Sequence, residues 1–148
     1  MSMFSMLETS GSALTAERQR AEITAANLAN TNTTRTDAGG PYRRKEVVFA
    51  SPGTFTFRLA LNHASSLPGP MLPMVRVERV LDDPAPPLMR YEPGHPDANK
   101  EGFVAYPAIN PIQEMTDLMG AVRAYQLNAS AVSASKQLLQ QALQILTG

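Results

Sequence analysis

The positions of the prolines divide this chain into three parts. All twelve prolines lie between Pro41 and Pro111, and residues 1–40 and 112–148 contain none. Proline lacks the amide hydrogen and clashes with the preceding turn of a helix. The middle therefore cannot hold a long helix, whereas both ends can. We predict two terminal helices that flank a segment of another kind.

Both ends carry apolar residues at heptad spacing, with steps of three and four residues. The N-terminal stripe is Phe4, Leu7, Gly11, Leu14, Arg18, Ala21, Ala25 and Leu28. The C-terminal stripe is Met115, Leu118, Val122, Tyr125, Ala129, Val132, Lys136, Leu139, Leu143 and Leu146. This spacing predicts helices that pack along a narrow seam. Asn110 and Pro111 form an N-cap and first-turn proline, which predicts where the second helix begins.

The two stripes also predict how the helices pair. If the helices run antiparallel and facing residue numbers sum to 150, Leu7 meets Leu143 and Ala25 meets Tyr125. Small residues then face large ones, which suits interdigitated packing.

The middle segment shows the period-two alternation of strands. Phe55, Phe57, Leu59 and Leu61 alternate with other residues, and so do Val75 and Val77. Short edge strands are predicted at Lys45–Phe49 and Phe103–Tyr106. The predicted fold is mainly α with a small β-rich insertion, in which the long terminal helices form an antiparallel coiled-coil layer around the strands. The expected division is 1–38 for the first helix and loop, 39–110 for the insertion and 111–148 for the last helix.

Composition excludes several classes of function. Thirteen basic and thirteen acidic residues cancel, so no net charge attracts nucleic acid. The absence of cysteine and the presence of only two histidines disfavour zinc sites and thiol chemistry, and no cofactor is expected. The N-terminal residues lack the pattern of a cleaved signal peptide, and no apolar run is long enough to span a membrane.

One stretch resembles a binding site for a small ligand. Asp97, Asn99, Glu101 and Gly102 mimic the opening of a calcium loop, but the twelfth position is Ala108 rather than a glutamate. A rigid turn is the preferred interpretation. His95 lies near Asp97, yet no serine or cysteine occupies a nucleophile motif, so we predict neither an enzyme nor a small-molecule substrate.

The last helix lacks charge on its outer face. From Ala124 to Gly148 the only charged residue is Lys136. A self-contained helix keeps charged residues toward solvent. We therefore favour packing among several subunits over a monomeric bundle, which stays an alternative.

Specific motifs resemble a known family. The run Ala26–Asn30, followed by Thr31, resembles the motif that ends the first helix of flagellar rod and hook proteins. The stretches Pro41–Lys45, Glu92–Ala98, Gly102–Val104 and Glu114–Asn128 resemble the proximal-rod branch of these axial proteins. The resemblance runs nearly end to end. It departs most between Ala60 and Pro87.

The resemblance implies a structural subunit of the bacterial flagellar basal-body rod, which crosses the periplasm and transmits torque. Implied partners are other rod subunits, copies of the same chain and the flagellar type III export apparatus, with export that needs no cleaved signal. Another rod- or hook-type axial component, or a non-flagellar helical adaptor, are the alternatives. The expected assembly interface comprises Phe4, Leu7, Leu14, Leu28, Asn27, Asn30, Met115, Leu118, Val122, Tyr125, Val132, Leu139, Leu143 and Leu146. Within it, Asn27 and Asn30 are expected to act by local hydrogen bonding at the helix end.

Overall fold

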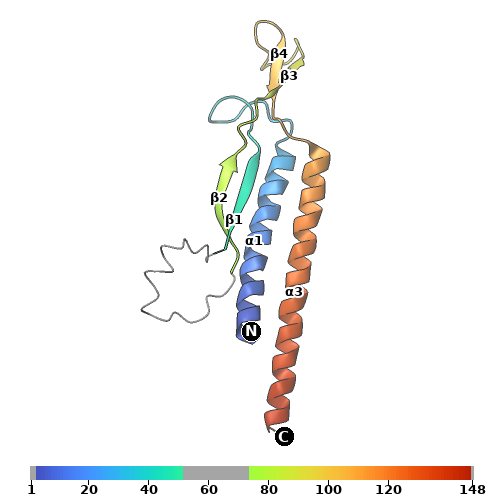
Figure 1. Cartoon of the computed structure of the whole chain (residues 1–148). Helices are drawn as coiled ribbons and strands as arrows, with labels where there is room; N and C mark the ends of the chain where they lie inside the picture. The colour runs from blue at the N-terminus through green and yellow to red at the C-terminus, as the bar shows by residue number, and fades with distance from the viewer. Residues whose placement is uncertain (1–2, 52–73, 148) are drawn as a thin grey trace, which may run out of the picture.

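Two long antiparallel helices define the axis of the molecule (Figure 1). A computed structural model describes residues 3–51 and 74–147. The elements are α1 (Met3–Ala29), β1 (Lys45–Ala50), β2 (Arg76–Asp82), β3 (Leu88–Tyr91), β4 (Phe103–Tyr106) and α3 (Pro111–Thr147). The prediction of a mainly helical fold with a small β-rich insertion is confirmed. The expected strand at Phe55–Leu61 lies outside the described residues.

Local hydrogen bonds fix the helix ends that meet the insertion. Asn110 caps α3, because its side-chain Oδ1 accepts a hydrogen bond from the Ile112 amide at 3.1 Å. At the end of α1, the Asn30 Nδ2 donates to the Ala26 carbonyl at 2.8 Å. The predicted cap and the predicted local role of Asn30 are therefore confirmed.

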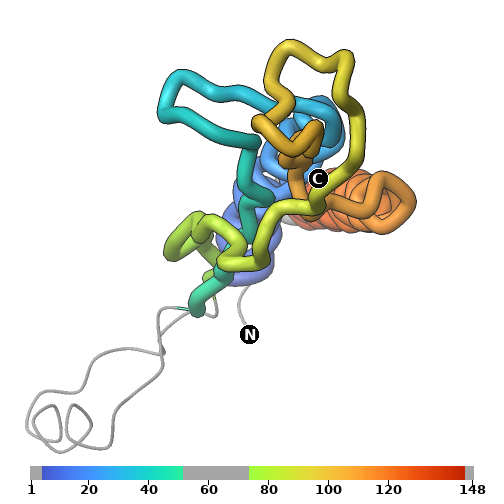
Figure 2. Tube along the Cα trace, turned by 90° about the horizontal axis from the view of Figure 1, so that it is seen from above, coloured from blue at the N-terminus to red at the C-terminus, as the bar shows by residue number. Residues whose placement is uncertain are grey.

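Helix α1 is the central element. The β1–β2 pair lies on one side of α1, and α3 lies on another (Figures 1 and 2). The two strands are antiparallel, with a register shift between Val48 and Phe49. The Val75 amide, next to β2, donates to the Ser12 hydroxyl of α1 at 3.0 Å. The sheet thus contacts the helix pair through α1.

The β3–β4 hairpin projects beyond the helices and rests on a small core (Figure 1). Val104, Tyr106 and Ile109 are buried at its base. The Tyr106 hydroxyl donates to Glu92 Oε2 at 2.9 Å, and the Arg90 guanidinium lies 4.7 Å from the Tyr106 ring centroid. These contacts stabilise a two-stranded hairpin that would be only marginally stable in isolation.

The buried positions of the helices are small or polar. In the described part of the chain they are Ser5, Ala16, Thr24 and Asn27 of α1 and Glu114, Ala121 and Ser135 of α3. Among the helices and strands, α3 packs on α1 alone. The larger apolar residues Met115, Val122, Tyr125 and Leu143 of the C-terminal stripe are exposed instead. The seam between the helices therefore does not follow the C-terminal stripe along its whole length.

The predicted helix register is wrong. Asn27 bonds Glu114 at 3.1 Å, and Arg20 lies 3.9 Å from Asp117, so facing numbers sum to 141 and 137 rather than 150. A shift of nine residues corresponds to about 13 Å along a helix. The polar contacts near the insertion set the pairing, and α3 consequently extends past the N-terminal end of α1 (Figure 1).

Candidate functional site

Asn27 is the centre of a polar cluster built around two buried side chains, those of Asn27 and Glu114. We call this cluster the hub: Asn27, Tyr42, Arg44, Lys45 and Glu114. The Asn27 side chain is almost fully buried. Its Nδ2 donates to the Lys45 carbonyl at 2.8 Å and to Glu114 Oε2 at 3.1 Å. Its Oδ1 accepts from the Lys45 amide at 2.9 Å and from the Tyr42 hydroxyl at 3.1 Å. The expectation that Asn27 acts locally is wrong, because these four bonds join α1 to β1, to the preceding loop and to α3.

Glu114 enters the hub from the first turn of α3. Its side chain is 2% exposed, and its Oε1 accepts from Arg44 Nε at 2.6 Å. Arg44 also pairs with Glu46. Burial alone would lower the pKa of Arg44, but the hydrogen bonds and charges of Glu114 and Glu46 raise it above its ordinary value. The buried carboxylate therefore faces a charged guanidinium.

Tyr42 closes the hub on the loop side. Burial, followed by the negative charges of Asp82 and Glu114, raises the pKa of the Tyr42 phenol. The phenol therefore stays protonated, and its hydroxyl donates a hydrogen bond to Asn27 Oδ1. This hydrogen bond ties the loop before β1 to the end of α1.

A second polar link holds the hairpin turn against the loop that follows α1. The Thr34 hydroxyl donates to Asp97 Oδ2 at 2.8 Å, and Arg35 lies 3.7 Å from the other oxygen. Asn99 Oδ1 accepts from the amides of Glu101 and Phe103. Asp97 and Asn99 thus serve the turn, as the preferred interpretation predicted. Within residues 3–51 and 74–147, no three acidic or histidine side chains gather as metal ligands.

His95 also serves the turn. Its Nδ1 accepts a hydrogen bond from the Asp97 amide at 3.1 Å, and its ring lies against Tyr106. The Asp97 carboxylate meets Thr34 and Arg35 rather than the imidazole. A base oriented by a carboxylate, which would need the Asp97 side chain on His95, is not formed by this pair.

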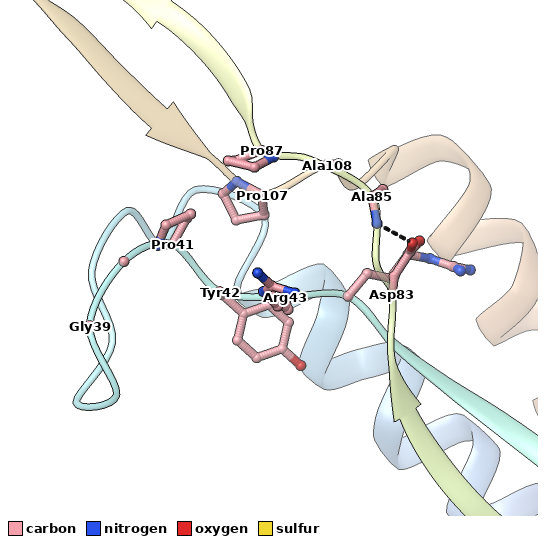
Figure 3. Close-up of a pocket in the computed structure, with 11 residues that line it drawn as sticks. Gly39, Pro41, Tyr42, Arg43, Asp83, Ala85, Pro87, Pro107 and Ala108 are labelled. Atoms are coloured by element: carbon pink, nitrogen blue, oxygen red, sulfur yellow. Dashed lines mark hydrogen bonds between the residues drawn. The ribbon is translucent and has the colours of Figure 1, made fainter.

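A pocket of about 190 Å³ lies where three linkers meet (Figure 3). Pro41, Pro87 and Pro107 supply much of its wall. The Asp83 carboxylate accepts from the Ala85 amide at 2.8 Å, and the Tyr42 hydroxyl bonds Asn27. Two of the polar groups in its wall therefore already form hydrogen bonds within the protein. The pocket is a junction between loops and does not resemble a catalytic cleft.

The expected interface residues fall into three groups. Asn27 is buried in the hub. Half-buried residues are Leu7, Leu14, Leu28, Asn30, Leu118, Val132 and Leu139, and exposed residues are Met115, Val122, Tyr125 and Leu143. The side chains of Phe4 and Leu146 lie outside the described part. The structure therefore leaves four of the expected interface residues exposed on α3.

Sequence reasoning missed Glu114 as a partner of Asn27 and Arg44 as the partner of Glu114. Arg44 belongs to the short basic run Arg43–Lys45, and Glu114 precedes the C-terminal stripe by one residue. The available signal was a polar Asn27 within an alanine-rich helix end, since such a residue needs partners when it is buried. The identity of those partners depends on how distant segments meet.

None of the helices in the described residues is apolar over a sufficient length to cross a membrane. The helices carry two distinct features. One is the hub, where polar side chains join the segments. The other is the exposed apolar part of α3.

Comparison with known proteins adds independent information. A family model described as flagella basal body rod protein matches residues 7–35, and one described as flagellar basal body rod FlgEFG protein C-terminal matches residues 100–145. The flagellar basal-body rod protein FlgC of Bacillus subtilis is 40% identical over 149 residues, covering 98% of this chain and 99% of the relative. That of Borreliella burgdorferi is 35% identical over 152 residues, with all of both chains covered. That of Salmonella typhimurium is 32% identical over 143 residues, with 97% of each covered.

Proposed function

The chain belongs to the FlgC family of flagellar basal-body rod proteins and is a structural subunit of that rod, and we propose that the exposed apolar surface of its helices is where the rod assembles. One observation carries this proposal. Along α3, many large apolar side chains face solvent, while the buried positions hold small and polar residues: the exposed set includes Ile112, Met119, Leu127, Leu138 and Ile145, besides four residues of the C-terminal stripe.

The energetics favour coverage by another chain. Burying one large apolar side chain stabilises a contact by roughly 1.5 to 3 kcal/mol. A long helix with many such side chains in water is unfavourable for a subunit that stays alone. The C-terminal half of α3 also contains a single charge, Lys136, so a neighbouring helix can pack there without desolvating ion pairs.

The shape of the molecule supports a layered arrangement in the rod. We assign residues 1–38 and 111–148 to an inner helical layer and residues 39–110 to an outer part. A rod needs contacts that repeat without closing, which heterologous interfaces provide. The proposed interface includes the stripe residues Leu7, Leu14, Leu28, Leu118, Val132 and Leu139. It also includes Phe4, near the N-terminus, and Leu146, near the C-terminus. Asn27 and Asn30 support this surface from the end of α1.

The proposal also covers partners and location. The subunit contacts other rod subunits and copies of itself, is exported from the cytoplasm through the flagellar type III apparatus without a cleaved signal, and crosses the periplasm as part of the rod. Its role is mechanical rather than catalytic. The family membership and the engaged polar groups of the hub support these points.

Complementation of a strain that lacks the gene tests the interface. Val122→Glu places a charge on the exposed apolar surface, and Thr116→Glu places the same charge on an exposed polar position of the same helix. We expect Val122→Glu to abolish swimming and to leave basal bodies without complete rods, while Thr116→Glu swims normally. Equal thermal unfolding of both purified variants shows that folding is preserved. Normal swimming with Val122→Glu would overturn this interface.

A further inference from the structure

The first three turns of α3 carry an apolar surface that contains two methionines. Ile112, Met115, Met119 and Val122 follow one another at steps of three, four and three residues, and so share one side of the helix. Their exposed fractions are 75%, 51%, 66% and 43%. We call these four residues the methionine face.

The methionine face is separate from the contacts that hold α3 in place. Glu114 and Ala121 belong to the same turns, yet they are 1% and 0% exposed. Glu114 carries the hydrogen bonds to Asn27 and Arg44. A chemical change confined to Met115 and Met119 therefore leaves the hub and the packing of Ala121 intact.

Exposed thioethers react with peroxides. The sulfur lone pair attacks one oxygen of hydrogen peroxide, an S–O bond forms as the O–O bond breaks, and the remaining oxygen leaves as water after proton transfer. Sulfur loses two electrons and the peroxide gains them. The product is methionine sulfoxide, which is polar and which methionine sulfoxide reductases convert back to methionine.

We propose that Met115 and Met119 form an oxidation-sensitive site that blocks incorporation of the free subunit into the rod while leaving its fold intact. This inference rests on the proposed function of the exposed α3 surface. Two sulfoxides would place polar oxygens in the middle of the apolar face, where a neighbouring subunit must exclude water. Once a neighbour covers the face, the sulfurs are shielded from peroxide.

Peroxide footprinting tests the coverage of the face. The purified subunit and isolated basal bodies receive the same dose of hydrogen peroxide, and peptide mass spectrometry measures the gain of one oxygen at each methionine. We expect oxidation of Met115 and Met119 to be at least about tenfold slower in basal bodies. Equal rates in both samples would overturn the coverage of this face, and with it the part of the proposed function that uses it.

Variants test the consequence separately. Met115→Gln with Met119→Gln imitates two sulfoxides, and Met74→Gln with Met89→Gln is the control, because Met74 and Met89 are also exposed but lie outside the helices. We expect the α3 variant to lose swimming with an unchanged unfolding midpoint. The control should swim, and Met115→Leu with Met119→Leu should swim and resist peroxide pretreatment of the subunit. Normal swimming of the α3 glutamine variant would overturn the oxidation site even if footprinting shows coverage.

Discussion

The side-chain amide of Asn27 pairs with the main chain of Lys45 as a neighbouring strand would. Its Oδ1 accepts from the Lys45 amide at 2.9 Å, and its Nδ2 donates to the Lys45 carbonyl at 2.8 Å. One residue of α1 thereby satisfies both outward main-chain groups at the start of β1. The same carboxamide reaches Glu114 of α3, so a single side chain fixes the sheet and both helices relative to one another.

Replacement of Asn27 should destabilise the whole fold. Asn27→Ala removes four hydrogen bonds and leaves the Lys45 amide and carbonyl without these partners, at a cost of about 2 to 4 kcal/mol in the free energy of unfolding. Urea denaturation followed by circular dichroism measures the change. Asn32→Ala, at an exposed position of the following turn, is the control and should change stability by less than about 0.5 kcal/mol. An equal loss in both variants would contradict the role of the hub.

Removal of Arg44 should leave an uncompensated buried charge. Arg44→Met keeps much of the side-chain volume but deprives the Glu114 carboxylate of its cation, so we expect a loss of about 2 to 4 kcal/mol. Arg43→Met is the matched control, since Arg43 is exposed. Adding Glu114→Gln to Arg44→Met should recover part of the loss in a double-mutant cycle. Additive losses would show that the two residues are not coupled.

Alkaline pH should weaken the fold through Tyr42. Folding raises the pKa of Tyr42 above its ordinary value of 10.0, chiefly by burial, so the folded state holds the proton more tightly than the unfolded state. This contribution is fully present below pH 10 and is lost as pH rises through the folded-state pKa. Tyr42→Phe should cost about 1 kcal/mol at pH 7 and reduce the decline of stability above pH 10. Urea denaturation of the wild type and of Tyr42→Phe at a series of pH values from about 7 to 11 measures both effects, and identical slopes above pH 10 would contradict the role of Tyr42.

Gly102 should tolerate no side chain. Its φ is +81°, and a Cβ there would lie 2.9 Å from Tyr91 Cε2 and 3.2 Å from the Pro93 Cβ. Gly102→Ala should therefore lower stability by about 1 to 3 kcal/mol, with loss of the near-ultraviolet signal from the Tyr91–Phe103 contact. Gly94→Ala belongs to the same turn and meets no atom within 4 Å. Equal unfolding temperatures of the two variants would contradict the requirement for glycine at position 102.

Cross-linking should distinguish the observed helix register from the one that the stripes predict. Ser10 and Val132 are both half-buried, and their numbers sum to 142, one more than the Asn27–Glu114 pair. Cysteines at these positions should join within one chain through a short bis-maleimide. Cysteines replacing Leu7 and Leu143 should not, because their sum of 150 places them about 13 Å out of register. Efficient linking of the second pair in the free subunit would contradict the observed pairing.

Local signals were sufficient to predict the element types. The proline boundary, the heptad spacing and the Asn110 cap predicted both helices. Period-two alternation at Val75 and Val77 predicted β2, and short pieces between turn signals predicted β1 and β4 as edge strands. These signals act within a few residues of the chain, so no knowledge of distant contacts is needed. Strand β3 was not predicted, because Leu88–Tyr91 is short and flanked by prolines; it is held by pairing with β4.

The sequence by itself determined that this chain forms two long helices around a β-containing middle, since proline placement and apolar spacing act locally, and its motifs indicated the rod family. Only the tertiary structure decided the helix register and which apolar residues stay exposed. Heptad spacing permits several registers of similar apolar burial, so it cannot choose among them. The choice comes from Asn27 and Glu114, 87 residues apart, because a buried amide and a buried carboxylate must find partners and only one register provides them.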